Sequence, residues 1–152
     1  MSKKITKKTT KKASRPNLYS TTSVTFKSHK SVVTKNDPVR EQRINYEIVV
    51  DAYDSDERAM GWHVSIDDTI QKNVRCRCRK TRSMSPLKIG EEVDVLGVAP
   101  ADDCESEMFV LVSWNDRELA VPLEQLEPIR GGAKSIEIIE DWLYWCLMGY
   151  KF

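Results

Sequence analysis

The stretch "MFVLVSWNDRELAVP" (residues 108–122) decides the fold class of this chain. Its first half, "MFVLVSW", is rich in β-branched and aromatic residues, which is typical of a strand. Asn115-Asp116 is a tight-turn signal, and "RELAVP" then returns as a second strand. We therefore predict a β-hairpin at this point of the chain.

Two segments on the N-terminal side of the hairpin predict further strands. In "VRCRCRK" (74–80) the apolar Val74, Cys76 and Cys78 alternate with arginines, as in a strand with one buried face. The run "SPLKIGEEVDVLGVAP" (85–100) predicts a turn followed by a strand that contains Val93 and Val95. Apolar residues after the hairpin close the sheet region, namely Leu123, Leu126 and Ile129. The sequence thus predicts four or five short antiparallel strands.

Helical patterns flank these strands. Asp37-Pro38 is a good opening for a first helix over about 38–53, because Asp caps well and Pro suits the first helical position. We expect Ser55 to cap a second helix, which ends near residue 70, and Ser135 to cap a last helix that stops at Gly149. The second helix has a modest apolar stripe, made of Ala59, His63, Ile66 and Ile70. The expected fold is α+β, with two N-terminal helices, a small antiparallel SH3-like β-barrel and a C-terminal helix.

Charge is divided sharply along the chain. Residues 1–40 hold eleven Lys and Arg and one acid, a net charge of +10, whereas residues 41–152 hold 13 basic and 22 acidic residues, a net charge of −9. The first segment also has few large apolar residues, so it cannot bury enough surface to offset its ordering entropy. We predict a disordered basic arm over 1–36 and a folded acidic domain over 37–152.

Several classes of protein are disfavoured by the same composition. The arm lacks the apolar segment that forms the central region of a secretory signal peptide. The most apolar run, "WLYWCLM" (142–148), is far shorter than the roughly 20 residues that cross a bilayer. None of the four cysteines is spaced as C-x-x-C, so we expect them to be reduced and buried in a cytoplasmic protein that does not bind membranes. They are Cys76, Cys78, Cys104 and Cys146.

Two adjacent carboxylates, Asp67 and Asp68, fall where the second helix is expected to end. Acids at this negative pole cost on the order of 0.3–1 kcal/mol each, and the last helical carbonyls lack a partner there. Carboxylate and carbonyl oxygens are the ligands that Ca²⁺ prefers, so a cation would reverse the sign of the interaction. A solvated pair, or one paired with Lys72 or Arg75, explains the same residues without a metal.

The loop "PADDCESE" (100–107) is the second acidic group. Four carboxylates lie within six residues, at Asp102, Asp103, Glu105 and Glu107. Like charges in so short a loop repel one another, and a divalent ion would relieve this, although a solvated acidic loop remains the alternative. A third acidic run, "DAYDSDE" (51–57), does not match the spacing of an EF-hand, and the start of a helix already explains its last two acids.

Catalysis has little support in the sequence. There is no Gly-rich phosphate loop and no G-x-S-x-G motif, and the acids around Cys104 would raise its pKa and weaken it as a nucleophile. We predict that the protein is not an enzyme. Only a pocket that joins His63 to a cysteine would reopen that prediction.

The basic arm offers a different function. Its repeated lysines would neutralise phosphates and bind nucleic acid in a salt-dependent way, or would bind an acidic protein. They are Lys3, Lys4, Lys7, Lys8, Lys11 and Lys12. An arm that only keeps the protein soluble is the simpler explanation.

Three segments together resemble the cyanobacterial-type calcium-binding protein family, the CcbP-like family. They are "REQRINYEIVVDAYDSDERAMGW" (40–62), "SPLKIGEEVDVLGVAPADDCESEMFVLVSWNDRELAVPLEQLEPI" (85–129) and "IEDWLYWCLMGYKF" (139–152). The resemblance implies a cytosolic α+β protein that binds Ca²⁺ through surface carboxylates without EF-hands, as a buffer or sensor of modest affinity. Relatives carry "WYYYLEDKL" where this chain has "WHVSIDDTI" (62–70), so the resemblance places Asp67 and Asp68 on two acidic positions of the family. The 102–107 acids fall on the family's acidic-Cys-acidic segment.

The sequence therefore leads to two functional hypotheses. In the first, Asp67 and Asp68 bind Ca²⁺ together with helix-end carbonyls, and the 102–107 loop forms a second, weaker site. We expect Ca²⁺ to be preferred over Mg²⁺, because an irregular and flexible set of oxygens suits its looser geometry. The alternative is an adapter that binds nucleic acid or a protein partner through the basic arm.

Overall fold

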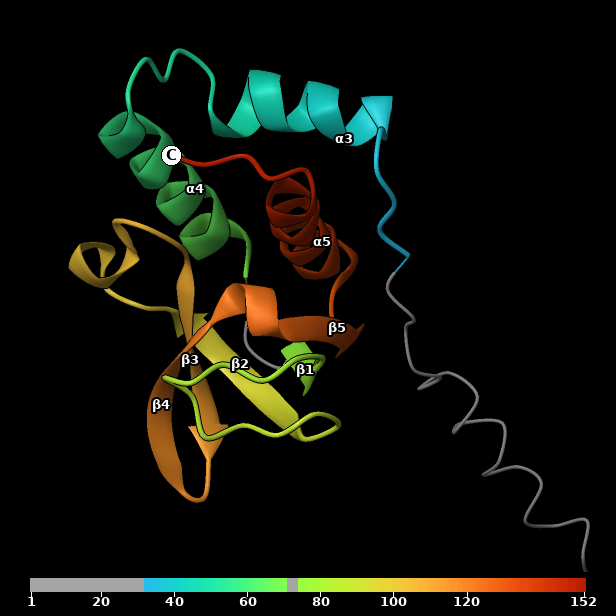
Figure 1. Cartoon of the computed structure of the whole chain (residues 1–152), viewed down its shortest axis with the longest axis vertical. Helices are drawn as coiled ribbons and strands as arrows, with labels where there is room; N and C mark the ends of the chain where they lie inside the picture. The colour runs from blue at the N-terminus through green and yellow to red at the C-terminus, as the bar shows by residue number, and fades with distance from the viewer. Residues whose placement is uncertain (1–31, 71–73) are drawn as a thin grey trace, which may run out of the picture.

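A computed structural model describes residues 32–70 and 74–152 of the chain. Its centre is a five-stranded antiparallel sheet, and the helices gather over one end of it (Figure 1). The strands are β1 (Val74–Cys78), β2 (Glu92–Val98), β3 (Phe109–Trp114), β4 (Arg117–Pro122) and β5 (Leu126–Arg130). Short 3-10 turns follow two of the strands, η2 (Ala101–Cys104) after β2 and η3 (Leu123–Gln125) after β4. The α+β class predicted from the sequence is confirmed.

The predicted hairpin is formed by β3 and β4. The two strands pair from Phe109 opposite Pro122 to Trp114 opposite Arg117. Asn115 and Asp116, which connect them, both have positive φ angles, 49° and 59°. Two successive residues with positive φ define the type I′ turn, whose twist matches that of a hairpin, and Asn and Asp tolerate this conformation well.

The sheet is open, in contrast to the expected SH3-like barrel. Its strand order is β4-β3-β2-β1-β5, so β4 and β5 are its two edges. Each edge strand contains a proline, Pro122 at the end of β4 and Pro128 within β5. Proline lacks the N–H that a further ladder needs, and it is tolerated at edges for this reason. The expected alternation in β1 is confirmed, since Val74, Cys76 and Cys78 are all buried.

The first helix is shorter than predicted. The α-helix α3 (Pro38–Arg43) continues as one π-helical stretch, η1 (Ile44–Ile48), and the helical backbone stops there rather than at residue 53. Asp51 has a positive φ of 58°, which no helix accommodates. The predicted cap is confirmed, because the Asp37 carboxylate accepts hydrogen bonds from the backbone N–H groups of Val39 and Arg40.

The second helix, α4 (Ser55–Thr69), is capped by Asp54 and not by Ser55. The Asp54 side chain accepts a hydrogen bond from the Glu57 backbone N–H at 2.9 Å, and the Glu57 carboxylate accepts one from the Tyr53 N–H at 2.6 Å. This reciprocal pair is a variant of the capping box, in which Glu57 bonds the residue before the N-cap instead of the N-cap itself. At Gly61 the helix passes close to the end of η1. A β-carbon at this position would overlap the carbonyl oxygen of Ile48, which explains the glycine.

The last helix, α5 (Ala133–Leu147), begins one turn earlier than expected. Its N-cap is Gly132, and Ser135, the expected cap, instead donates a hydrogen bond from its hydroxyl to the Thr69 carbonyl at 3.0 Å. The predicted stop is confirmed: Gly149 has a φ of 78°, and its N–H bonds to the Cys146 carbonyl.

The core lies between the sheet and the helices. Tryptophans join α4 to α5: the ring of Trp62 meets those of Trp142 and Trp145 edge-on, with centroids 5.0 Å and 5.6 Å apart. Such edge-to-face pairs add to the gain from burial. Trp62 is fully buried, so this residue, rather than His63, belongs to the core face of α4.

The cysteines match the sequence interpretation. All four are free; three are buried and Cys146 is partly buried. Burial raises the pKa of the Cys76 and Cys146 thiols to about 12. In the part of the chain that the structure describes, no helix combines the length and the apolar character needed to span a bilayer.

Candidate metal site

The acidic loop between β2 and β3 is fixed at its base. The buried Cys104 thiol lies close to the carbonyls of Ala99 and Phe109, at 3.8 and 3.7 Å, and its sulfur accepts the Phe109 N–H at 3.4 Å. His63 of α4 makes a second contact with the base of the loop, since its Nε2 lies 2.8 Å from the Ala99 carbonyl oxygen. The loop is therefore anchored through its apolar and backbone atoms, which leaves its carboxylates outside.

Three of the four loop acids are exposed, namely Asp102, Asp103 and Glu105. Two of them, Asp102 and Glu105, line a cavity of about 370 Å³ between the loop and α4. Asp56, in the first turn of α4, lies on the opposite wall. We call this cavity the loop hollow. Its remaining lining residues are Ala59, Met60, His63, Ala101 and Cys104, so no Lys or Arg is among them.

Asp56 is a candidate ligand that the sequence did not reveal. It was explained as an acid at a helix start, and it does occupy the first turn of α4. Its proximity to residues 45 or more positions away depends on the packing of η2 against α4, which no local pattern encodes.

The fourth loop acid, Glu107, already has a partner. Its carboxylate is held by the Arg82 guanidinium at 2.7 and 3.1 Å, a two-point contact. Hydrogen bonding to Glu107 is the largest of the effects that raise the pKa of Arg82. Of the four predicted loop ligands, Glu107 is thus the one whose charge an internal cation neutralises.

Asp67 and Asp68 lie apart from the loop. Both are exposed in the last turn of α4, roughly 16 Å along the helix from Asp56 at 1.5 Å per residue. The Thr69 carbonyl, one of the expected helix-end ligands, accepts the hydroxyl of Ser135. The structure therefore does not unite the two predicted acidic groups into one site.

Asp68 lines a different cavity, of about 230 Å³, at the junction of α4 and α5. Both acids and bases line it, since Arg43 and Lys134 lie in its lining together with further acids, namely Glu47, Glu137 and Asp141. Arg75, one of the partners considered for this pair, instead bonds Glu92 and Asp94 on the neighbouring strand. Lys72, the other one, lies outside the described residues.

Within residues 32–70 and 74–152, no three His, Cys, Asp or Glu side chains are close enough together to hold a metal ion. The loop hollow thus presents exposed carboxylates on facing walls rather than a finished coordination sphere. Exposed side chains can change rotamer at little cost, and Ca²⁺ accepts irregular sets of six to eight oxygens. The arrangement suits an ion that gathers its ligands on binding.

The loop hollow also joins His63 to Cys104, the pairing that would reopen catalysis. However, the imidazole Nε2 contacts the Ala99 carbonyl, and the thiol lies near that same carbonyl. Burial raises the pKa of the Cys104 thiol, which keeps it protonated. Neither group is arranged as a nucleophile and its base, and the geometry gives catalysis no support.

The six lysines of the alternative hypothesis lie outside the described residues, as does most of the predicted arm over 1–36. They are Lys3, Lys4, Lys7, Lys8, Lys11 and Lys12. Binding of nucleic acid or of an acidic protein through them stays a prediction.

Comparison with protein families decides between the hypotheses for the folded domain. A family model described as calcium binding, that of the CcbP proteins, matches residues 42–146, which is more than two thirds of the chain. The chain belongs to the CcbP family of calcium-binding proteins. Calcium binding is therefore its function and Ca²⁺ its ion, and the resemblance noted in the sequence is confirmed.

Two solved structures are similar to this member of the CcbP family over nearly their full length. The crystal structure of Anabaena CcbP shares 40% identity, with a TM-score of 0.68, and the match covers 78% of this chain and 98% of that one. A calcium-binding protein in its calcium-binding form shares 39% identity, with a TM-score of 0.67 and coverage of 77% and 96%. No curated protein gives a significant match.

Proposed function

We propose that this protein binds Ca²⁺ chiefly at the loop hollow, where Asp56, Asp102 and Glu105 supply carboxylate oxygens. The single observation that carries the proposal is the lining itself: acids from two elements face one cavity that contains no basic side chain. Asp103, exposed in the same 3-10 turn, adds negative charge at the rim. A divalent cation would replace the mutual repulsion of these groups with attraction.

Ca²⁺ suits this cavity better than Mg²⁺. Mg²⁺ demands a nearly ideal octahedron and gives up its water reluctantly, whereas Ca²⁺ tolerates irregular and partly hydrated sites. The loop is tied at its base by Cys104 and His63, yet its acids are exposed and free to move. We expect modest affinity, because the ion has to order these side chains as it binds.

Asp67 and Asp68 form the weaker site in this proposal, which reverses the order expected from the sequence. The reason is local charge: Arg43 and Lys134 share the cavity that Asp68 lines, and one of the helix-end carbonyls is already bonded. These cations repel Ca²⁺, and they already pair with two acids of the same cavity, Glu137 and Asp141. We also propose a cytoplasmic buffer or sensor, which the four free cysteines support.

Isothermal titration of the full chain with CaCl₂ in 0.15 M salt tests the principal site. The double variant Asp102→Asn, Glu105→Gln should weaken the tightest binding event by at least about tenfold, because affinity follows the number of charged ligands. The matched control is Asp116→Asn, Glu118→Gln, which removes two exposed charges from the hairpin and should change little. Equal effects of the two variants would show that only net charge matters and would overturn the assignment.

A further inference from the structure

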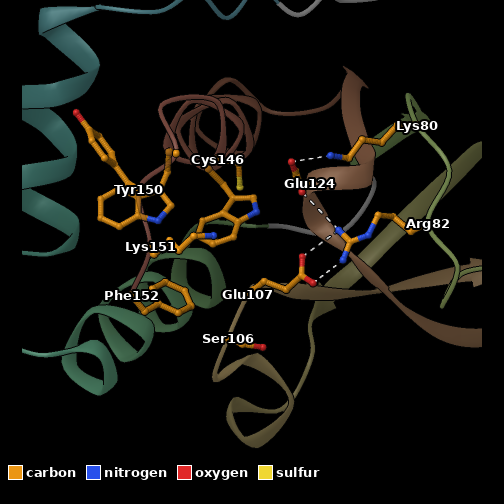
Figure 2. Close-up of a pocket in the computed structure, with 12 residues that line it drawn as sticks. Lys80, Arg82, Ser106, Glu107, Glu124, Cys146, Tyr150, Lys151 and Phe152 are labelled. Carbon is orange, nitrogen blue, oxygen red and sulfur yellow. Dashed lines mark hydrogen bonds and ion pairs between the residues drawn. The ribbon is translucent and has the colours of Figure 1, made fainter.

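A third cavity, of about 420 Å³, includes Glu107 and Ser106 of the acidic loop in its lining. Figure 2 shows its two sides: Tyr150, Lys151 and Phe152 of the segment after α5 on one, and a chain of charged side chains on the other. We call it the aromatic hollow. Its volume falls within the range of about 300–1,000 Å³ that is usual for small-molecule sites.

The charged side consists of four residues linked in series (Figure 2). The Lys80 ammonium is 2.7 Å from Glu124, which also reaches Arg82 at 3.4 Å, and Arg82 in turn grips Glu107 at 2.7 Å. The side chains of Arg82, Glu107 and Glu124 are each 24% exposed. The guanidinium thus lies at the surface of the cavity, partly screened from water, with an internal carboxylate on it.

The balance of charge around the aromatic hollow is the reverse of that of the domain. Lys80, Arg82 and Lys151 outnumber the two acids Glu107 and Glu124, although residues 41–152 carry a net charge of −9. Within the described residues Lys151 has no hydrogen-bond or ion-pair partner. An exposed, unpaired ammonium that faces a guanidinium across the cavity favours an anionic group between them.

The opposite wall is aromatic. Trp142 and Phe152 lie with ring centroids 5.8 Å apart, and Trp145 and Tyr150 at 5.0 Å. All four line the cavity. The indole N–H of Trp142 is also buried without an acceptor in the described part of the chain. The rings meet tilted and edge-on, and the more exposed ones, Tyr150 and Phe152, give the cavity an apolar face that favours an aromatic group.

We propose that the aromatic hollow binds a small aromatic anion, such as an arene carboxylate or sulfonate. Its ring lies against Tyr150 and Phe152, which are more exposed than the tryptophans behind them, and its acid group contacts Lys151 and takes the place of Glu107 on Arg82. Glu107 is then an internal competitor for the ligand. This site is separate from the loop hollow, and it does not depend on where Ca²⁺ binds.

The proposal can be tested with 8-anilino-1-naphthalenesulfonate, an aromatic sulfonate whose fluorescence rises on binding. The full-length chain is titrated in EGTA, so that no calcium contributes. Lys151→Gln should weaken binding about tenfold, since it removes a charge-assisted contact. Glu107→Gln should tighten binding several-fold, because it frees the guanidinium. Lys134→Gln is the matched control, as that lysine is 83% exposed on the far end of α5.

Two further measurements locate the probe and identify what it recognises. The uncharged analogue N-phenyl-1-naphthylamine should bind at least about tenfold more weakly than the sulfonate if the cations select the ligand. In ¹H–¹⁵N spectra, the indole signals of Trp142 and Trp145 should shift on titration, whereas that of Trp114 in the hairpin should not. The proposal is overturned if both analogues bind alike, if Lys134→Gln matches Lys151→Gln, or if Trp114 shifts equally.

Discussion

Two groups of acids in this molecule have opposite surroundings. Glu140 and Asp141 of α5 are buried beneath α3, where Arg40 bonds both of them and Arg43 bonds Asp141 at 2.6 and 2.7 Å. Asp102 and Glu105 are exposed at the loop hollow, with no basic residue in its lining. Both groups are carboxylates of one acidic domain, yet only in the first group do arginines neutralise the negative charge.

The two groups illustrate the difference between acids that stabilise the fold and acids that stay available to bind an ion. A buried carboxylate must be paired, because an isolated charge in the interior is far too costly. Its pairing then makes it unavailable to an ion. An exposed carboxylate is hydrated at no such cost and stays available. In this protein the arginines of α3 pair with the buried acids of α5, and the loop keeps exposed carboxylates that the proposed calcium site would use.

The largest expected effect follows from removing a structural acid. Asp141→Asn should lower the free energy of unfolding by about 3 kcal/mol, because it leaves the partly buried Arg43 guanidinium with only the longer contact of 3.4 Å to Glu137. Urea denaturation followed by circular dichroism measures this. Asp103→Asn is the exposed control and should stay within about 0.5 kcal/mol of the unaltered chain. Similar losses in both would erase the distinction between the two groups.

The second prediction concerns the binding acids. Without calcium, Asp102→Asn, Glu105→Gln should be at least as stable as the unaltered chain, because fewer like charges face one another. With calcium at 100 times the dissociation constant of the unaltered chain, that chain should gain about 2.7 kcal/mol, and a variant that binds tenfold more weakly should gain about 1.4 kcal/mol. Thermal unfolding in EGTA and in CaCl₂ gives both numbers. A variant that gains as much as its parent would place the ion elsewhere.

A smaller effect is expected at the end of α4. Replacing Asp67 and Asp68 by Asn removes negative charge from the negative pole of the helix, so each change should add about 0.3–1 kcal/mol of stability in EGTA. The same denaturation experiment measures it. Calcium affinity at the tightest site should stay within a few-fold. If that affinity collapsed instead, the order of the two sites would return to the one expected from the sequence.

The smallest effect is an alkaline one. Tyr150 donates a hydrogen bond to Glu41 at 2.7 Å, and this bond raises its pKa to about 12. The folded state then keeps a proton that the unfolded chain loses near pH 10, so this stability is present below pH 10 and is lost as the pH rises toward 12. Tyr150→Phe should flatten the decline between these values. Since Tyr150 is 38% exposed, the effect should be below about 1 kcal/mol; an unchanged slope would contradict it.

Local patterns in the sequence sufficed for the hairpin and the first strand. The Asn115-Asp116 turn and the alternation of β1 are encoded in adjacent residues. The N-caps of two helices were predicted one to three residues too late. Asp54 caps α4 in place of Ser55, and Ser135 donates its hydroxyl to the Thr69 carbonyl instead of capping α5. Boundaries of this kind depend on tertiary contacts rather than on propensity.

The candidate site was predictable in its residue types but not in its grouping. Asp102 and Glu105 stand out as crowded acids, whereas Asp56 joins them only through the packing of the loop against α4. Conversely, no local pattern in the sequence indicates that Arg82, 25 residues away, pairs with Glu107 and so makes it unavailable as a calcium ligand. The open sheet was missed for a similar reason: only η3 separates β4 from β5 along the chain, yet the two strands pair with different neighbours and form the opposite edges of the sheet.

Glu107 belongs to two neighbourhoods at once, as a member of the acidic loop and as the carboxylate on Arg82. A dication that attracts Glu107 toward the loop would unmask the guanidinium, and an anion that occupies the guanidinium would release Glu107 to the loop. Thermodynamic reciprocity requires the two effects to be equal in size. Glu107 would then make the two proposed sites positively cooperative, each ligand strengthening the binding of the other.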